Sequence, residues 1–277
     1  MTKTRKLGTW MNVFFLTIGV LIMLYPLAWL ISTALKPDVF ALDGHFIPTH
    51  FTLGNFSAIL SPTSAAPVPQ WLFNSLFVSI SASVLVMVID SLAAFALARL
   101  QFYARRFIFS LVVASLVVPF IVLLIPLYNE FSQANLLDTY WALILPYTSN
   151  AFGVFLLYQF FRGIPKELED AAVADGASKF QIWWKIFVPL SIPGTATLGL
   201  LTFMNVYNDF FWPLVATAST PMRTMTVGVA IMTIGTYSTQ YSFMMALTLF
   251  SVIPMVIAFL FAQKQLVQGI ATTGFNA

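Results

Sequence analysis

Four polar side chains stand out because they occur inside long apolar stretches of the sequence. They are Asp90 in one stretch and, in another, Asn205, Asn208 and Asp209. A carboxylate at the centre of a bilayer costs about 2.5–3.5 kcal/mol on insertion scales, so such a group usually faces a cavity or a partner. Amides and carboxylates can hydrogen-bond the hydroxyl groups of a polar solute. These residues are therefore candidates for a polar strip along a translocation path, and helix–helix contacts are the alternative.

A charged segment, 162–192, holds a second set of candidates. Pro165 suits the first turn of a helix, and the acidic residues that follow it favour the positive end of that helix. Gly176 predicts the end of the helix, and Ser178 can cap a second helix that carries aromatic residues. The helical spacing places four residues on one small, weakly apolar face: Leu168, Ala171, Ala172 and Asp175. Such a face lets another protein approach closely, and a loop helix lying on the membrane is the alternative.

The sequence offers little support for binding of a metal, of ATP or another cofactor, or of nucleic acid. The chain has no cysteine, and its two histidines lie in the proline-rich stretch 36–70, so we expect no metal site. The sequence lacks the G-x-x-x-x-G-K-[ST] motif, so we expect no ATP or other cofactor to be held by this chain. The basic residues are dispersed, which argues against nucleic acid as a partner.

The composition indicates that membrane-spanning helices position these candidates. Hydrophobic residues make up 59% of the 277 residues and charged residues only 8%, against about 25% charged in ordinary globular proteins. So few charges cannot cover the surface of a soluble protein, which excludes a soluble enzyme. The apolar windows are continuous and about 20 residues long, which favours helices over the alternating strands of a β-barrel.

We expect an all-α polytopic membrane protein with one transmembrane domain over residues 1–277. Its six spans are expected at about 11–35, 71–98, 107–128, 139–161, 192–216 and 242–263. The first window is too long for a signal peptide, so we interpret it as a retained helix. With both termini in the cytoplasm, eleven of the thirteen Lys and Arg residues lie inside, as does segment 162–192 between spans four and five. Three tryptophans near span ends are expected at the membrane interfaces: Trp71, Trp141 and Trp212.

The charged segment resembles the EAA loop of bacterial ABC importer permeases. The family pattern is Glu-Ala-Ala, three residues, glycine, nine residues, isoleucine, one residue, leucine and proline. Here the pattern reads Asp170-Ala171-Ala172, Gly176, Ile186, Val188 and Pro189. All spacings hold, although an aspartate replaces the glutamate and a valine replaces the leucine. Further segments resemble the carbohydrate branch and its maltose-type second permease: 32–37, 90–102, 165–168, 207–213 and 268–274.

The resemblance implies a transport subunit of the bacterial inner membrane and not an enzyme. It implies a second, homologous permease as partner, together with two ATP-binding cassette subunits that bind ATP and Mg²⁺. Each ATPase would grip one EAA loop as a coupling helix, and an extracytoplasmic solute-binding protein would deliver sugar. The docking residues that it implies are Pro165, Leu168, Asp170, Ala171, Ala172, Asp175, Gly176 and Ala177.

Several alternatives stay open at this point. One is an EAA-type permease for a polyol, glycerol phosphate, amino acid or peptide, although a phosphorylated solute predicts Lys or Arg within a span, and none lies mid-span. A secondary transporter normally has repeats and ion-coupling groups near the midplane, which fits poorly here. A membrane scaffold would not need the coupling loop. In this family the main sugar site can lie on the other permease, which weakens the case for direct substrate contacts here.

Overall fold

The computed structural model describes residues 3–61, 66–234 and 239–274, and side chains from residue 11 to 261 within those ranges and at 263. The side chains of the family-like segment 268–274 lie outside the described part. All regular elements in the described ranges are helical, as the composition predicts. The α-helices are α1 (Lys3–Ala34), α2 (Gly54–Leu60), α3 (Val68–Arg99), α4 (Arg105–Ser115), α5 (Leu124–Gln133), α6 (Tyr140–Ile144), α7 (Ala151–Gly163), α8 (Lys166–Ala174), α9 (Lys179–Ile182), α10 (Val188–Leu190), α11 (Ile192–Asn208), α12 (Phe211–Ala216), α13 (Met225–Ile234) and α14 (Tyr241–Gly274).

Short helices of other types connect some of these elements. Tight 3-10 helices cover Asp38–Phe40, Phe120–Leu123, Leu145–Thr148 and Thr220–Met222. A π-helical turn, Trp183–Phe187, lies between α9 and α10. Such turns are rare and often occur at functional sites, and this one belongs to the segment that resembles the EAA loop.

Three described helices are long and apolar enough to cross a membrane: Met11–Ala34, Val68–Arg99 and Tyr241–Phe261. Three pairs of helices meet the same criterion only together, because each pair is bent by more than 40° at a short break. The pairs are Arg105–Ser115 with Phe120–Gln133, Tyr140–Thr148 with Ala151–Gly163, and Lys179–Leu190 with Ile192–Asn208. The described chain thus has three clear apolar spans, and up to six if each bent pair is one span.

The structure interrupts three of the spans that we expected to be continuous helices. In the window 139–161, α6 ends at Ile144 and α7 begins only at Ala151. In the window 107–128, α4 ends at Ser115 and Pro119 lies in the break, with a bend of 97° before Gln133. A proline has no N–H to donate and disfavours helical backbone at the preceding residue. In the window 192–216, α11 ends at Asn208 and α12 starts only at Phe211.

Asp209 is the physical reason for the interruption in the window 192–216. Its backbone is extended, with φ −64° and ψ 136°, and its Oδ1 accepts a hydrogen bond from the N–H of Phe211 at 3.1 Å. Aspartate side chains often bond the backbone two residues on and so compete with the helix. A hydropathy window averages over such a residue and therefore does not register the break.

The described helices belong to two compact units. The first contains residues 1–69 and 228–253, and the second contains 70–227 and 254–277. In the first unit a buried base organises the segment after α1. Lys36 is 1% exposed, and its ammonium donates to Asp43 Oδ1 at 2.6 Å and to the backbone oxygen of His45 at 2.5 Å. The side-chain amide of Asn55 donates to the carbonyl of Ala34, the last residue of α1, and to that of Lys36 just after the helix, both at 2.8 Å.

We expect the segment after α1 to lose protection only in strong acid. The hydrogen bond from Lys36 lowers the pKa of Asp43 from 3.8 to about 2. Because the folded pKa is lowered, the stabilisation is fully present above pH 3.8 and is lost as the pH falls toward about 2. The rate of pepsin cleavage at Phe46, measured across this window, should rise toward the acid end. In an Asp43→Asn variant the step should vanish, and an unchanged step would assign it to another group.

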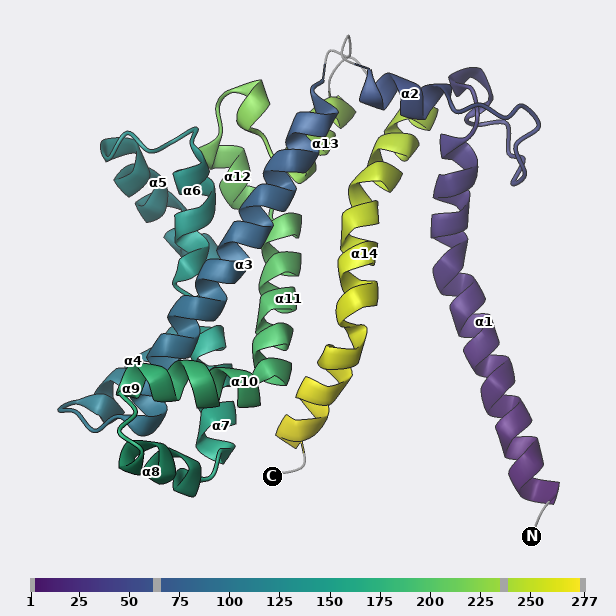
Figure 1. The fold of residues 1–277 in the computed structure, drawn as a ribbon. Coiled ribbons are helices and arrows are strands. Elements are labelled where there is room, and N and C mark those ends of the chain that lie inside the picture. Colours follow the sequence, from purple (N-terminus) through teal and green to yellow (C-terminus); the bar gives the residue numbers. More distant parts are fainter. Residues whose placement is uncertain (1–2, 62–65, 235–238, 275–277) are drawn as a thin grey trace. The chain divides into compact units, whose positions relative to one another are not determined.

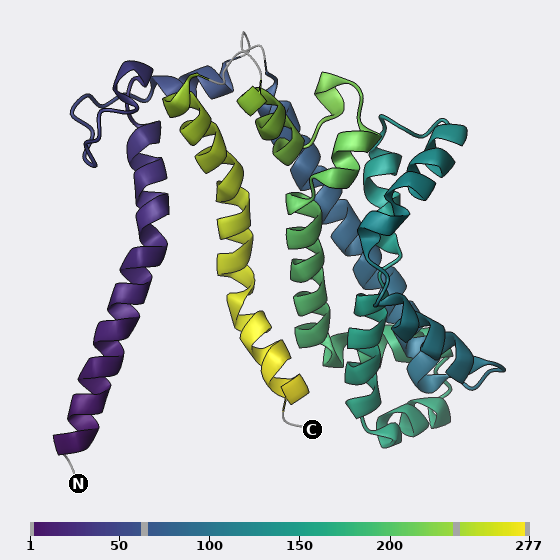
Figure 2. The ribbon, with the colours of Figure 1, turned by 180° about the vertical axis from the view of Figure 1, so that it is seen from behind.

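The second unit contains an aromatic core between α3, α7 and the segment 182–198. Fully or nearly buried members of this core include Phe95, Leu157, Phe161, Ile182, Phe187 and Leu198. The rings of Phe95 and Phe161 lie 5.0 Å and 5.4 Å from the ring of Phe187 in edge contacts. Helices α8, α9 and α10 lie at the end of α3 and α7 next to this core, whereas α5, α6 and α12 gather toward the opposite end (Figures 1 and 2).

Two of the three tryptophans near span ends are packing residues. Trp71 and Trp212 are 2% and 0% exposed, whereas Trp141 is 61% exposed. The indole N–H of Trp212 donates to the backbone oxygen of Ala142 at 2.8 Å, and that of Trp71 donates to Thr220 at 2.7 Å. A buried indole needs such a partner, so these two side chains pack the second unit.

Candidate functional site

The charged segment forms a helix, a glycine turn and a second helix. Helix α8 ends in a turn in which Gly176 adopts φ +82°. The N–H of Ala177 donates to the carbonyl of Ala172 at 2.9 Å, and that of Gly176 donates to Val173 at 3.0 Å. This is the pattern of a Schellman motif, which satisfies the last carbonyls of a helix and favours glycine. A capping box between Ser178 and Gln181 then begins α9.

An ion pair ties the two helices together. Glu169 in α8 is 6% exposed, and its Oε1 lies 3.1 Å from the Nζ of Lys179 in α9. Ala172 and Ala177 pack against the aromatic core of the second unit. Glu169 and Lys179 were not among the sequence candidates. Their signal is a carboxylate and an amine ten residues apart, and only the turn at Gly176 brings these groups together.

Arg99 connects this loop to the ends of two long helices. It is the last residue of α3, and its guanidinium donates to the backbone oxygens of Phe161 in α7 and Ile164 after α7. The same group lies 4.9 Å from the ring centroid of Phe187. Guanidinium suits this place because it combines forked donors with a flat face that stacks on rings. Arg99 therefore links the end of α3 to the end of α7 and to the segment that leads into α8.

The outward face of α8 is small and mixed in character. Leu168 is 44% exposed and Val173 is 49% exposed, and the latter was missed in the sequence. The remaining predicted docking residues are exposed, except Ala172 and Ala177, which are half-buried: Pro165, Asp170, Ala171, Asp175 and Gly176. Apolar contacts flanked by carboxylates suit a protein partner that presents a groove with basic groups at its edge.

A separate cavity of about 510 Å³ brings together three of the four candidate path residues. Asn205, Asn208 and Asp209 all line it. Further polar lining residues, missed in the sequence, come from the break between α6 and α7 and from α11: Tyr147, Ser149, Asn150 and Thr202. Irregular backbone at membrane depth is tolerated where it lines a cavity, and broken helices often build transporter sites. The helix breaks at 145–150 and 209–210 fit that rule.

Both the carboxylate and the backbone oxygen of Asp209 already have hydrogen-bond partners. Tyr147 donates its hydroxyl to Asp209 Oδ2 at 2.6 Å, and the Thr226 hydroxyl donates to the backbone oxygen of Asp209 at 2.8 Å. Asn205 and Asn208 are exposed and present their amides at the cavity. The two amides can therefore bind a solute, while Asp209 fixes the geometry of the helix break.

Asp90 does not join the other three candidates. It is 1% exposed, and its Oδ2 has no hydrogen-bond partner among the described residues. It lies where α3 meets α7 and α11, close to the α-carbon of Gly153 and to Leu198. This surrounding agrees with the alternative of a helix–helix contact.

Comparison with known proteins assigns the chain to a class. Residues 90–272 match the family described as "binding-protein-dependent transport system inner membrane component". The chain belongs to this family and is a permease component of a transport system. It is 34% identical to the arabinooligosaccharides transport system permease protein AraQ of Halalkalibacterium halodurans, over 98% of each chain. It is 32% identical to the sn-glycerol-3-phosphate transport system permease protein UgpE of Yersinia enterocolitica, over 92% and 93% of the two chains.

A solved structure has the same fold. It is a crystal structure of a bacterial ABC transporter involved in the import of the acidic polysaccharide alginate. One chain of that structure matches with a TM-score of 0.82 at 22% identity, over 95% of the present chain and 98% of the other. The broken helices of the second unit therefore belong to a fold that occurs in ABC importers.

Proposed function

We propose that the protein is a permease subunit of an ATP-driven, binding-protein-dependent sugar importer in a bacterial cytoplasmic membrane. It acts as one transmembrane domain with six spans, of which three are broken, and with both termini in the cytoplasm. It forms half of the translocation path together with a second, homologous permease. Two ATPase subunits bind and hydrolyse ATP with Mg²⁺, and an extracytoplasmic binding protein delivers the solute.

The observation that carries this proposal is the helix–turn–helix at 166–182, which an ion pair and the hydrogen bonds of Arg99 hold in place (the braced loop). Its outward face, with Leu168 and Asp175, suits docking of an ATPase subunit. On the inward side Glu169 pairs with Lys179, and Arg99 joins the loop to the ends of α3 and α7. Because these contacts hold the parts of the loop together, a movement of α8 also moves α9 and the ends of α3 and α7.

A neutral, hydroxyl-rich solute fits the cavity better than a phosphorylated one. The described lining contains amides, hydroxyls and one carboxylate that Tyr147 already engages, and neither Lys nor Arg is among these residues. A phosphate group would call for guanidinium or ammonium donors. AraQ, by its name a permease for arabinooligosaccharides, supports the sugar class, whereas UgpE keeps glycerol phosphate as the second candidate.

Isolation of the complex tests the proposal. The tagged chain, extracted from its native membrane in mild detergent, should carry along a second permease and an ATPase in twofold molar excess over each permease. Intact-mass analysis identifies the components. A chain that is recovered alone, under conditions that preserve other ABC complexes, contradicts the proposal.

We expect an Asn205→Ala, Asn208→Ala double variant to weaken the response to solute. Each amide lost as a hydrogen-bond partner costs about 0.5–1.5 kcal/mol, or about two- to tenfold in half-saturating concentration. The measurement is solute-stimulated ATP hydrolysis by the reconstituted complex as a function of solute concentration. Asn129→Ala removes an exposed amide outside the cavity and should change nothing. If both variants behaved alike, the main solute contacts would have to lie on the second permease.

A further inference from the structure

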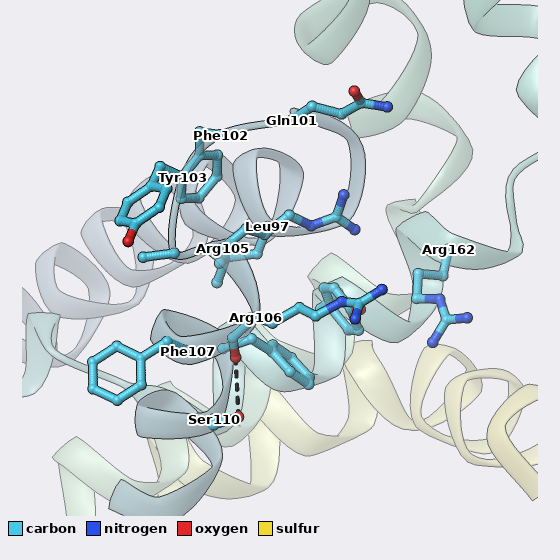
Figure 3. A pocket seen from close by; sticks show the side chains of 12 residues that line it. Leu97, Gln101, Phe102, Tyr103, Arg105, Arg106, Phe107, Ser110 and Arg162 are labelled. Atoms are coloured by element: carbon cyan, nitrogen blue, oxygen red, sulfur yellow. Dashed lines mark hydrogen bonds between the residues drawn. The ribbon is translucent and has the colours of Figure 1, made fainter.

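A second, larger pocket in the second unit is strongly basic. It has a volume of about 1290 Å³ and is lined by the end of α3, the loop 100–104, the first turns of α4 and the end of α7. Three of its described lining residues are arginines, Arg105, Arg106 and Arg162, and none is an acid. The guanidinium groups of Arg105 and Arg106 extend toward the side on which Arg162 lies (Figure 3).

The positive charge of this pocket is not neutralised by the described part of the chain. The described ion pairs involve Lys36, His45 and Lys179, and none of the three arginines. Arg105 donates to the carbonyls of Ala98 and Leu100, at 3.1 Å and 3.2 Å, and so caps the end of α3. Arg162 lies 5.8 Å from the ring centroid of Tyr158. Both contacts leave the net charge in place.

The position of two arginines in α4 adds to the field. Arg105 and Arg106 are the first residues of this helix, whose first turn has no acid and whose N-cap, Ala104, makes no side-chain hydrogen bond. The start of a helix carries partial positive charge, and basic residues are disfavoured there unless an anion is near. A pocket with this arrangement selects a negatively charged ligand.

The surroundings of the pocket indicate a ligand with an apolar part. Tyr103 is 98% exposed and Phe107 is 64% exposed, and both line the pocket. Along α4 the apolar side chains continue outward with Leu111, which is 54% exposed. A free phosphate ion makes no favourable contact with such an apolar surface. A phospholipid places its headgroup among basic residues and its acyl chains along apolar side chains, and aromatic residues favour the same interface.

We propose that this pocket binds the phosphate headgroup of an anionic phospholipid of the cytoplasmic leaflet. The proposal rests on the topology proposed above, which puts the loop 100–104 at the cytoplasmic face. The headgroup phosphate lies among Arg106, Arg162 and the first turn of α4, and the acyl chains follow α4 into the bilayer. Bound lipid then holds together the ends of α3, α4 and α7, next to the braced loop.

Lipid retention by the complex, purified in mild detergent through the tagged chain, tests the proposal. The protein is incubated with equal amounts of phosphatidylglycerol and phosphatidylcholine, and the lipid that stays bound is counted by mass spectrometry. We expect enrichment of phosphatidylglycerol in the native chain. In an Arg106→Gln, Arg162→Gln variant this enrichment should fall about fivefold for each charge removed.

A matched control removes two exposed cytoplasmic bases outside the pocket, in Lys166→Gln, Lys185→Gln. This control should retain phosphatidylglycerol like the native chain. Equal loss in both variants would indicate general charge attraction and overturn the proposal. Displacement of the lipid by inorganic phosphate alone would overturn it in favour of a soluble anion. Undiminished enrichment in the pocket variant, with loss of the co-purified ATPase, would overturn it in favour of a protein contact.

A separate measurement distinguishes failure of the topology from failure of the lipid site. Because the chain has no cysteine, Gln101→Cys introduces one labelling position in the loop 100–104. In sealed spheroplasts a membrane-impermeant maleimide should leave it unlabelled, and after lysis the label should react. Labelling of intact spheroplasts would overturn the topology, and with it the assignment of the pocket to the cytoplasmic leaflet.

Discussion

Gly176→Pro is expected to abolish solute-stimulated ATP hydrolysis while the amount of membrane-inserted protein stays normal. Gly176 adopts φ +82° and donates its N–H to Val173 at 3.0 Å. Proline holds φ near −65° and has no N–H, so the turn that joins α8 to α9 cannot form. Even an ordinary L-residue costs about 1–2 kcal/mol in this conformation. Each 1.4 kcal/mol of this cost lowers the population of the formed turn, and with it of the docked loop, about tenfold.

Gly163→Ala is the matched control for this prediction. Gly163 is the last residue of α7, three residues before α8, and an added Cβ meets nothing within 4 Å. Reconstituted complexes of the two variants are compared by ATP hydrolysis with and without the solute and its binding protein. Gly163→Ala should behave like the native complex. Normal stimulation in Gly176→Pro would show that docking does not depend on the turn, and would remove the main support for the coupling role.

The sequence reveals the helix–turn–helix at 166–182 because its signals are local. Pro165, Gly176 and Ser178 each act on backbone within a few residues, so their effects can be predicted from spacing alone. The contacts that hold the same loop in place are not local. Arg99 bonds the carbonyl of Ile164, 65 positions away, and a single sequence contains no mark of which carbonyl an arginine caps.

The residues that line the cavity also divide into those that local sequence signals reveal and those that only long-range packing brings there. Polar residues in an apolar stretch predicted that Asn205, Asn208 and Asp209 belong together. Tyr147 lies 62 positions from Asp209 and reaches it only because two helices break at neighbouring places. Hydropathy also leaves the surroundings of Trp212 undecided, since an apolar side chain that faces lipid and one that faces the protein give the same signal. Packing partners, not composition, decide between these two.

Asp90 shows why a general rule leaves a role open. An acid in a span usually faces a cavity or a partner, and here the side chain is buried where three helices meet. The deciding feature is Gly153 in α7, which has no side chain and lets the carboxylate of α3 approach the backbone. Neither residue alone carries this information in the sequence, because the pairing depends on the register of α3 against α7.

Gly153→Ala is therefore expected to destabilise the second unit strongly. The new Cβ would overlap the Oδ2 of Asp90 and lie 2.8 Å from Leu198 Cδ1, closer than carbon atoms pack. Overpacking of this kind costs about 1–3 kcal/mol, or about 2–4 °C in melting temperature per kcal/mol for chains of roughly this size. The measurement is thermal unfolding in detergent, followed by the intensity of the monodisperse peak after heating.

A second substitution tests the proposed cause. Asp90→Ala removes the overlapping carboxylate, so Asp90→Ala combined with Gly153→Ala should melt higher than Gly153→Ala alone. Asp90→Asn keeps the size of the side chain and should give no rescue. Asp90→Ala by itself should cost little, because it also removes a buried oxygen without a described partner. Rescue by asparagine as well as alanine would instead mean that charge, not the close approach of α3 to α7, sets the cost.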